Sequence, residues 1–400
     1  MNEAPYAGPD QESDVFQYFP ETYSWSLAVA ASIAMGGEIS ELDEALAPLA
    51  GISGHGKSAD EAWYQNWMKL GEKLTALAEA DLERGNRFSA SSKQLRAANY
   101  YLMAERMASW SDPRRMHAYD LGLTSFREGL ELSGAPVQRV EVDYEGGVLA
   151  GWLRLADTRA PQPAMVFYNG FDSIKEMHYL MCADIAARRG IATLFVDQEG
   201  TGEAIRYHRF PKRHDTEVSA ALFFDALAAN PAIDKDRIGI VGLSMGGYCA
   251  PRAAAFEGRF KCVASFGGFY ELDDVWQAIL GGAAQPGVSD GLPESSLHAM
   301  RVTGTTSITE AIASLKRRTL EGVLGRIRCP LLVVHGENDR QVALRHAQKI
   351  VAGAVNSAEA ELRVFSLREG GAEHCGIDVM SMQSEYVFDW AARVLGAARG

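Results

Sequence analysis

The sequence predicts an α/β protein in which a mostly parallel sheet, covered by helices on both faces, follows an all-helical region. Apolar residues from Tyr23 to about residue 134 recur at helical spacing, with no convincing strand pattern. At Val137 the spacing changes to the alternation of strands. From Ala164 onward, short apolar runs alternate with helical segments, which is typical of βαβ units and a parallel sheet.

The chain of 400 residues is too long for one ordinary core, so we expect two domains or a large insertion. The pattern divides it into an arm (residues 1–22), a helical cap or lid domain (23–135) and an α/β domain (136–400). Within the last, residues from about 269 to 325 break the βαβ alternation with helical and Gly/Pro-rich pieces. We interpret them as a cap insertion above the sheet.

Local signals place the helices of the first region. Ser58 and Glu61 form a predicted capping box at the start of a helix that Gly85 ends. A second helix is expected over about 91–109. A third begins after Asp112 with a proline at its first position and ends at Gly134.

The α/β region is predicted from its apolar runs. The expected strands are 137–142 and 148–155, joined as a hairpin, then 164–168, 191–196, 237–241, 262–266, 330–335 and 361–367. The expected helices are 179–190, 214–230, 245–256 and 381–396.

Charge and composition exclude several functional classes. With 39 Lys and Arg against 52 Asp and Glu, the chain is a poor match for nucleic acid or an anionic membrane surface. Its five cysteines are scattered without a CxxC pair, so reduced and mostly buried thiols are expected rather than a zinc site. The apolar run 27–35 follows an acidic segment and is too short to span a bilayer, so we expect a cytoplasmic protein.

The motif Gly242-Leu-Ser-Met-Gly246 lies between a short apolar strand and a helical segment. This is the pattern of a nucleophile elbow, in which Ser244 occupies a strained strand-to-helix turn. The strained turn requires neighbours without side chains, and Gly242 and Gly246 meet that need. An ordinary βα turn would give the same five letters, so the motif requires partners elsewhere in the chain.

A serine nucleophile needs a base and an acid that orients it, in the α/β-hydrolase order Ser, Asp or Glu, His. Asp339 follows the predicted strand 330–335, and His374 follows the last predicted strand. Glu337 and Glu373 are rival acids, but Glu373 is adjacent to the base and would point away from it. Of the other eight histidines, we interpret His335 as structural and His117 and His298 as surface residues.

The oxyanion that forms on attack needs two amide donors. We expect one from Met245, directly after the nucleophile, and the other from Phe171 in the loop after strand 164–168, where Gly170 permits close approach. The glycines of residues 197–202 match neither GxGxxG before a helix nor GK[ST], so we expect no cofactor and no metal. The predicted fold is therefore the α/β-hydrolase fold.

The chain also resembles a known family. Glu61-Ala-Trp-Tyr-Gln-Asn-Trp67, the segment 96–101, the elbow and Gly371-Ala-Glu-His374 are similar to the FrsA-like α/β-hydrolases, which carry an N-terminal helical domain. Within this family it is similar to enzymes that shorten polyketide chains or act in nicotine breakdown. The resemblance implies hydrolysis of a carbon–carbon bond next to a ketone by Ser244, Asp339 and His374 without a cofactor. It also suggests an additional glutamate, for which Glu271 is the nearest candidate.

These features lead to one main hypothesis and two alternatives. The main one is retro-Claisen hydrolysis of a polyketide or aromatic β-diketone through an acyl-enzyme. The alternatives are an esterase, thioesterase or acyltransferase with the same triad, and a non-catalytic interaction protein that uses its helical array. We expect a small-molecule substrate and a homodimer, with neither nucleic acid nor membrane as partner. The aromatic candidates for lining the pocket are Trp63, Tyr64, Tyr100, Tyr101, Tyr270 and Trp276.

Overall fold

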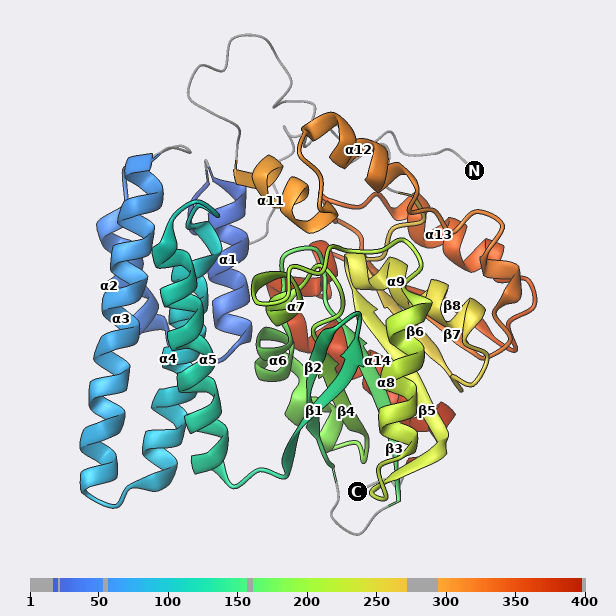
Figure 1. Ribbon diagram of the computed structural model, residues 1–400, viewed down its shortest axis with the longest axis horizontal. Helices are drawn as coiled ribbons and strands as arrows, with labels where there is room; N and C mark the ends of the chain where they lie inside the picture. Colours follow the sequence, from blue (N-terminus) through green and yellow to red (C-terminus); the bar gives the residue numbers. More distant parts are fainter. Residues whose placement is uncertain (1–16, 21, 53–56, 157–160, 272–293, 398–400) are drawn as a thin grey trace.

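The computed structural model describes residues 17–20, 22–52, 57–156, 161–271 and 294–397 (Figure 1). Within them, eight strands form one sheet in the order β1-β2-β4-β3-β5-β6-β7-β8. The pairs β1/β2 and β2/β4 are antiparallel, and all pairs from β4 to β8 are parallel. The strands are β1 (Val137–Tyr144), β2 (Gly147–Arg154), β3 (Gln162–Tyr168), β4 (Ala192–Val196), β5 (Ile233–Leu243), β6 (Val263–Phe266), β7 (Leu331–Gly336) and β8 (Ala360–Phe365).

Five helices precede the sheet in the described part of the chain: α1 (Tyr23–Ala34), α2 (Ile39–Leu46), α3 (Lys57–Glu83), α4 (Arg87–Met107) and α5 (Pro113–Ser133). The other helices are α6 (Lys175–Ala187), α7 (Gly202–Arg206), α8 (Glu217–Ala228), α9 (Met245–Phe256), α11 (Glu294–Thr303), α12 (Ile308–Lys316), α13 (Leu344–Gly353) and α14 (Met380–Leu395). Short 3-10 turns are η1 (Ala47–Leu49), η3 (Leu324–Arg326) and η4 (His374–Val379). The predicted strands and helices of the α/β region are confirmed within a few residues. The structure adds the short α7 and α13, which the sequence did not predict.

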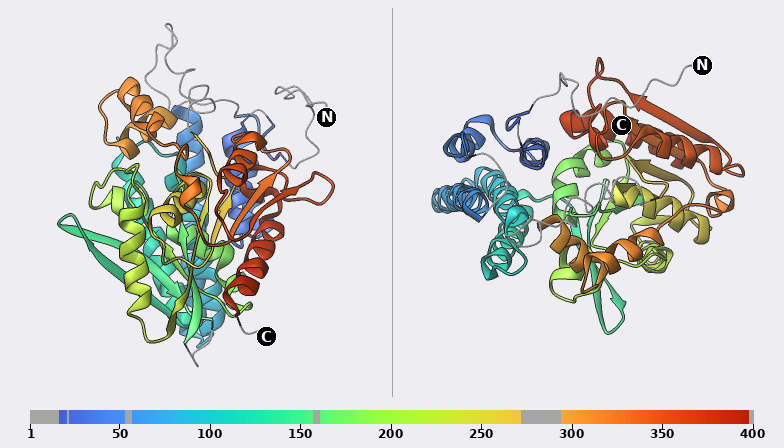
Figure 2. Two further views of the ribbon diagram at one scale, coloured as in Figure 1. Left: turned by 90° about the vertical axis from the view of Figure 1, so that its right-hand side faces the viewer. Right: turned by 90° about the horizontal axis from the view of Figure 1, so that it is seen from above.

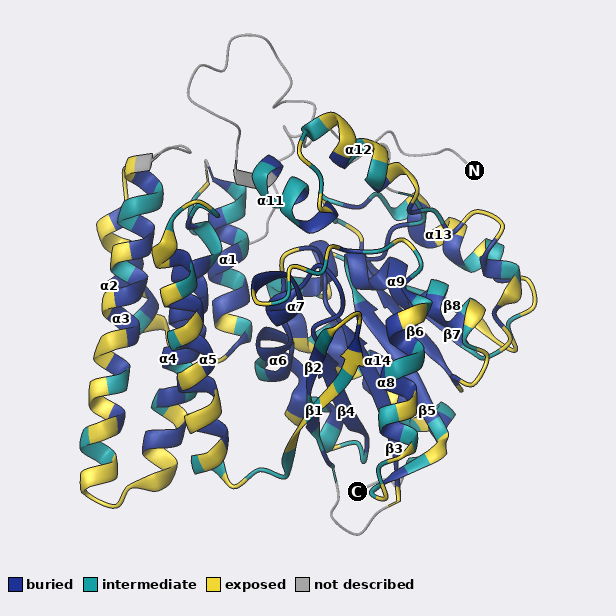
Figure 3. Cartoon of the chain, in the orientation of Figure 1, coloured by how far each residue is buried: buried dark blue, intermediate teal, exposed yellow. Residues whose placement is uncertain are grey.

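The two faces of the sheet belong to two cores. Along β3, Met165 and Phe167 pack with α6, α14 and the helices α1–α5, whereas Val166 and Tyr168 pack with α8, α9 and α13. This split follows from the alternation of side chains along a strand. Figure 3 shows β3, β4, β6 and β7 buried along their length, and the outer faces of α3 and β1 exposed. The sheet therefore lies between two layers of helices, as a run of buried apolar strands predicts.

Helices α1–α5 form a bundle beside the sheet, on the side of α6 (Figures 1 and 2). Its core is aromatic: ring centroids lie 4.8 Å apart for Trp25 and Trp63, 5.4 Å for Trp63 and Trp67, and 5.7 Å for Trp67 and Tyr100. Gly71 of α3 faces Tyr101 of α4 so closely that a Cβ there would lie 2.6 Å from the ring. The close approach of these two helices therefore depends on the missing side chain.

The ends of these helices can be compared with the helix caps that the sequence predicts. The start of α5 is confirmed, because the Asp112 carboxylate accepts a hydrogen bond from the Arg114 amide, and Gly134 ends the helix at φ 73°. The predicted capping box is wrong: α3 begins at Lys57, so Ser58 lies inside the helix. The Glu61 carboxylate instead pairs with the Arg114 guanidinium at 2.7 Å.

The segment between β6 and β7 contributes α11 and α12, which lie above the sheet in Figure 1. The backbone amide of Lys212 donates to the Val302 carbonyl at 2.7 Å, which ties α11 to the loop before α8. The five cysteines are free, and all except Cys329 are buried, as expected. None of the helices that the structure describes has the length and hydropathy required to cross a membrane.

Candidate active site

Ser244 lies between the end of β5 and the first residue of α9, with φ 57° and ψ −116°. A non-glycine residue reaches this region only under strain, which the surrounding packing must hold. The glycines of the motif make that packing possible. A Cβ on Gly242 would lie 2.0 Å from the Gly246 carbonyl oxygen, and one on Gly246 would lie 2.4 Å from the Tyr168 carbonyl oxygen. The predicted steric reason for both glycines is confirmed.

The structure brings the three predicted residues together from three loops. His374 Nε2 lies 2.9 Å from Ser244 Oγ, and His374 Nδ1 lies 2.8 Å from Asp339 Oδ2. The other carboxylate oxygen of Asp339 accepts hydrogen bonds from the amides of Gln341 and Val342, both at 2.9 Å. A carboxylate held in this way fixes the imidazole with a proton on Nδ1, so that Nε2 can accept the proton of Ser244.

Electrostatics support the same arrangement. Burial opposes protonation of His374, but the Asp339 carboxylate overcomes it and raises the pKa of the imidazole well above its usual value. Burial disfavours the charged form of Asp339, yet His374 and the Val342 amide lower the pKa of that carboxyl. The Asp339 side chain is only 1% exposed, so it remains ionised through these contacts rather than through hydration.

The rival acids have other partners. The Glu373 carboxylate accepts from Asn338 at 2.6 Å and from Arg340 at 3.0 Å, and so points away from the imidazole as expected. Glu337 accepts from the Leu367 amide at 3.0 Å. His335 is buried and lies 2.8 Å from the Val342 carbonyl oxygen, which confirms its structural place in the core.

The loop 169–173, which we call the oxyanion loop after its proposed role, lies beside Ser244. A Cβ on Gly170 would lie 3.4 Å from the Ser244 Cβ, so the loop passes as close as the sequence predicts. Phe171 is its buried central residue, and Met245 is the first residue of α9. The two proposed amide donors therefore come from the two chain segments that border Ser244.

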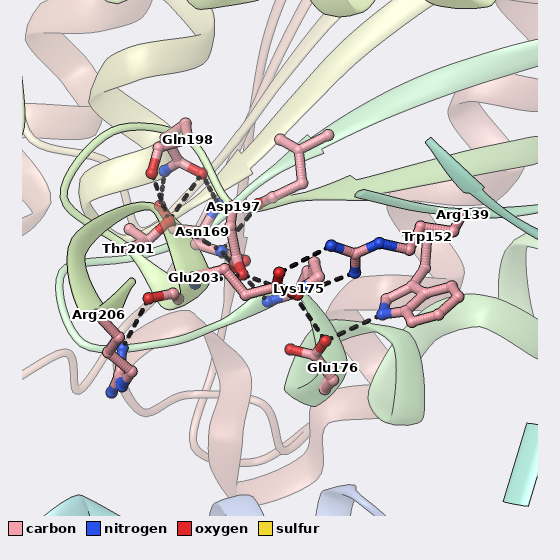
Figure 4. Close-up of polar contacts among 12 residues, drawn as sticks. Arg139, Trp152, Asn169, Lys175, Glu176, Asp197, Gln198, Thr201, Glu203 and Arg206 are labelled. Atoms are coloured by element: carbon pink, nitrogen blue, oxygen red, sulfur yellow. Dashed lines mark hydrogen bonds and ion pairs between the residues drawn. The ribbon is translucent and has the colours of Figure 1, made fainter. Parts of the chain in front are cut away.

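Gln198 holds the start of this loop. Its amide oxygen accepts from the Asn169 backbone N–H at 3.1 Å, and its amide nitrogen donates to the Asn169 carbonyl at 2.8 Å. The Asn169 side chain donates in turn to Asp197 at 2.8 Å (Figure 4). Residues 197–202, for which we expected no cofactor, thus hold the backbone at the start of the oxyanion loop.

A buried ionic cluster around Lys175 lies next to the contact between Asn169 and Asp197 (Figure 4). Lys175, fully buried at the start of α6, pairs with Glu176 at 2.8 Å, Asp197 at 2.7 Å and Glu203 at 2.6 Å. Arg139 of β1 adds a bond to Glu203 at 2.8 Å. Burial raises the pKa of Glu203, but the two cations overcome this and lower it to about 2. The cluster anchors the chain on both sides of the oxyanion loop.

Ser173 and His178 hold the other end of the loop. The Ser173 hydroxyl oxygen accepts from the Gly170 amide at 2.7 Å and lies 2.9 Å from His178 Nε2. Burial lowers the pKa of His178 to about 3, so the ring is neutral at physiological pH. The hydroxyl therefore links the Gly170 amide to the His178 ring, and the tautomer of His178 decides which of the two groups donates.

His298 contacts the loop from α11, and its assignment to the surface is wrong. Its ring stacks on Trp110 with centroids 5.7 Å apart and meets Phe171 edge-on at 4.9 Å. Trp110 Nε1 lies 3.1 Å from Nδ1, and Nε2 lies 3.3 Å from the Phe171 carbonyl oxygen. An indole can only donate, so Nδ1 accepts and Nε2 carries the proton that goes to Phe171. No short motif indicates this contact, because the partners are 127 residues apart.

Two ion pairs add to this connection between the helices and the site. Arg106 at the end of α4 pairs with Asp172 of the oxyanion loop at 2.6 Å. Arg206 of α7 pairs with buried Glu105 of α4 at 2.8 Å. The end of α4 therefore contacts both the oxyanion loop and α7.

A cavity of about 120 Å³ borders Ser244 and His374. Four of the predicted pocket aromatics do not line it. Trp63 donates to the Met103 carbonyl at 2.7 Å, Tyr64 to the Arg114 carbonyl at 3.1 Å and Tyr100 to Glu41 at 2.6 Å, while Tyr101 lies 3.3 Å from the Thr75 hydroxyl. All four are buried in the helical bundle, so their helical spacing indicated core packing rather than substrate contact.

The candidates from the insertion differ as well. Tyr270 lies under the Lys349 ammonium, 5.2 Å from the ring centroid, and the Glu271 carboxylate pairs with the same ammonium at 2.6 Å. Neither residue borders the cavity at Ser244. Trp276 lies outside the described residues.

The family model for FrsA-like esterases ("Esterase FrsA-like") matches residues 29–369. The chain belongs to this family. It is an α/β-hydrolase by fold and by relationship, which confirms the resemblance found in its motifs.

Curated relatives cover most of the chain. Hydrolase LUC6 of Fusarium sp. is 28% identical over 90% of this chain and 93% of its own length. The 2,6-dihydropseudooxynicotine hydrolase of Paenarthrobacter nicotinovorans is 28% identical over 84% of this chain and 86% of its own. The 20-hydroxy-prefusarin hydrolase FUS2 of Gibberella moniliformis is 29% identical over 82% and 87%.

Solved structures agree. The crystal structure of 2,6-dihydroxy-pseudo-oxynicotine hydrolase matches with a TM-score of 0.75 and 25% identity, over 92% of this chain and 95% of that chain. Wild-type AbyA5 matches with a TM-score of 0.68 and 19% identity over the same shares of the two chains, which supports the fold alone.

Proposed function

We propose that this α/β-hydrolase is a serine hydrolase that cleaves a carbon–carbon bond next to a ketone, in a polyketide or aromatic β-diketone. The observation that carries the proposal is the unbroken hydrogen-bonded chain from Ser244 through His374 to Asp339, at 2.9 and 2.8 Å. The choice of bond is supported by relatives whose names include 2,6-dihydropseudooxynicotine hydrolase and a prefusarin hydrolase.

In the proposed reaction, His374 Nε2 takes the proton of Ser244 as Oγ attacks a carbonyl carbon. The amides of Met245 and Phe171 stabilise the oxyanion. The carbon–carbon bond then breaks, and its electrons form the enolate of the departing ketone, which the His374 imidazolium protonates. Water activated by His374 hydrolyses the acyl-enzyme, giving a carboxylic acid and free Ser244.

Product analysis tests the choice of bond. Purified enzyme is incubated with an aryl β-diketone and, separately, with simple esters, and the Ser244→Ala variant serves as the control. The proposal requires a ketone and a carboxylic acid from the diketone with wild type alone. Intact diketone together with rapid ester hydrolysis would support the esterase alternative, which the description of the family favours.

A further inference from the structure

A second, larger cavity lies between α1 and the α/β region, with a volume of about 400 Å³. Figure 1 shows α1 on the side of the helical bundle next to α6. The cavity is bounded by α1, α6, η4 and the start of α14. Its walls are mostly apolar, and the side chains that form them include Leu27, Ala30, Ile33, Met181, Ile185 and Ile377.

The larger cavity adjoins the one at Ser244. Leu27, Met181 and Ile377 line both, so these three side chains lie between the two spaces. On α6, Met177 borders only the cavity at Ser244, Met181 borders both, and Ile185 borders only the larger one. Residues four apart lie on one face of a helix, so the cavities follow each other along α6 over about 12 Å.

The sizes of the two spaces show why they are needed together. The cavity at Ser244 has about 120 Å³, whereas pockets for drug-sized ligands usually measure about 300–1,000 Å³. The smaller space alone is below this range. With the larger cavity added, the space available next to the nucleophile falls within the usual range.

The polar groups around the larger cavity already have partners. Arg340 pairs with Glu373 at 3.0 Å and covers the ring of Tyr23 at 4.3 Å. The Asp378 carboxylate accepts from the amides of Gly371, Ala372 and Glu373 at 2.8, 3.1 and 2.9 Å. These charges are satisfied within the protein, so the cavity offers its apolar walls rather than a charged partner to a ligand.

From the adjacency of the two cavities, their sizes and their polarity, we propose that the larger cavity is a substrate subsite that holds a long, uncharged apolar arm of the molecule attacked at Ser244. Leu27, Met181 and Ile377 form the passage that this arm crosses, and they determine how long an arm the enzyme accepts. This inference rests on the proposed function, because it takes Ser244 as the nucleophile.

A substitution on α1 tests the subsite. Ala30 lines only the larger cavity, so Ala30→Phe would fill it from the far side of the passage. Ala76→Phe, on the exposed face of α3, is the matched control. The kcat/KM is measured for p-nitrophenyl esters from acetate to decanoate, and for acetate esters of alcohols from methanol to decanol. In wild type and Ala76→Phe we expect kcat/KM to rise with chain length in one of the two series. In Ala30→Phe the ratio of kcat/KM for the longest ester to that for the shortest ester of this series should be lower by about tenfold or more. Equal ratios in all three proteins, in both series, would overturn the subsite.

A trapped complex tests it without a variant. A phosphonofluoridate bonds to a nucleophilic serine with loss of fluoride, and the protein is crystallised after reaction with a decyl derivative. The alkyl chain should run along α6 past Met181 toward Ile185, and a chain that leaves into solvent would refute the proposal. A small ethyl derivative distinguishes a failure of the proposed function from a failure of the subsite. If it fails to label Ser244, the proposed function itself is wrong, whereas labelling by the ethyl probe with a misplaced decyl chain rejects only the subsite.

Discussion

The indole of Trp110, just beyond α4, donates a hydrogen bond to His298 of α11 at 3.1 Å, and the same imidazole reaches the Phe171 carbonyl oxygen at 3.3 Å. Two segments outside the sheet thus fix the conformation of the oxyanion loop. Burial lowers the pKa of His298 to about 4, so the ring stays neutral and keeps this orientation at physiological pH.

Loss of this contact should reduce turnover. His298→Leu replaces the imidazole with an apolar side chain of similar size. It removes both hydrogen bonds, so the Phe171 amide is less well positioned for the oxyanion. We expect kcat to fall by about tenfold to a hundredfold with little change in KM for a small ester. His117→Leu, at an exposed histidine of α5, is the control. Equal kcat values for the two variants would show that His298 only packs.

The pH profile should report the Asp339–His374 pair. His374 acts as a base only when it is neutral, and Asp339 raises its pKa, so kcat/KM should fall as the pH drops through a value above the usual histidine pKa. Asp339→Asn removes the opposing charge. In this variant the acidic limb of the kcat/KM profile should move to lower pH, and the maximal kcat/KM should fall by about 10⁴-fold. An unmoved limb would mean that another group controls the profile.

Gly246→Ala should destabilise the protein. The added Cβ would lie 2.4 Å from the Tyr168 carbonyl oxygen and 2.8 Å from that of Asn169, both rigid backbone atoms. Overpacking of this kind costs about 1–3 kcal/mol of unfolding free energy. Gly258→Ala is the control, because a Cβ there meets nothing within 4 Å. Urea denaturation should therefore separate the two variants, and equal midpoints would contradict the steric argument.

Lys175→Met should be strongly destabilising. The change leaves Glu176, Asp197 and Glu203 in a buried site with one cation fewer, which costs about 3–5 kcal/mol for a broken buried pair. Lys73→Met breaks an exposed pair with Glu44 and should cost less than about 1 kcal/mol. Denaturant midpoints compare the two, and a small effect at Lys175 would mean that its carboxylates take up protons instead.

Acid should weaken the same cluster. The pKa of Glu203 is lowered to about 2 in the folded protein, below its value in an unfolded chain. The stabilisation it provides is complete above the unfolded pKa and is lost as the pH falls toward 2. Glu203→Gln should flatten this part of the stability curve in acid denaturation followed by circular dichroism. An unchanged slope would exclude Glu203 as a source of the acid sensitivity.

The sequence predicted well wherever one local rule decides the outcome. Strand alternation gave β1 and β2, proline after Asp112 gave the start of α5, and chain order with a loop after each strand gave the positions of Ser244, Asp339 and His374. It failed where packing between distant segments decides. Apolar and aromatic residues at helical spacing are the same whether they face a core or a ligand, so Trp63 and Tyr100 were assigned to the pocket. His298 could not be placed from the sequence because its partners are distant in the chain: Phe171 lies in the oxyanion loop, and Trp110 lies just beyond α4.

The contacts at the end of α4 also limit how such proteins can be recombined. The helical bundle contributes Glu105, Arg106 and Trp110, which pair with Arg206, Asp172 and His298 in the rest of the chain. A bundle transplanted from a relative would leave Arg206 and Asp172 without these ion-pair partners, and His298 without its hydrogen-bond donor, unless all three contacts were matched. Chimeras designed to change substrate preference should therefore join the parents so that the end of α4 is exchanged together with residues 169–173, α7 and α11.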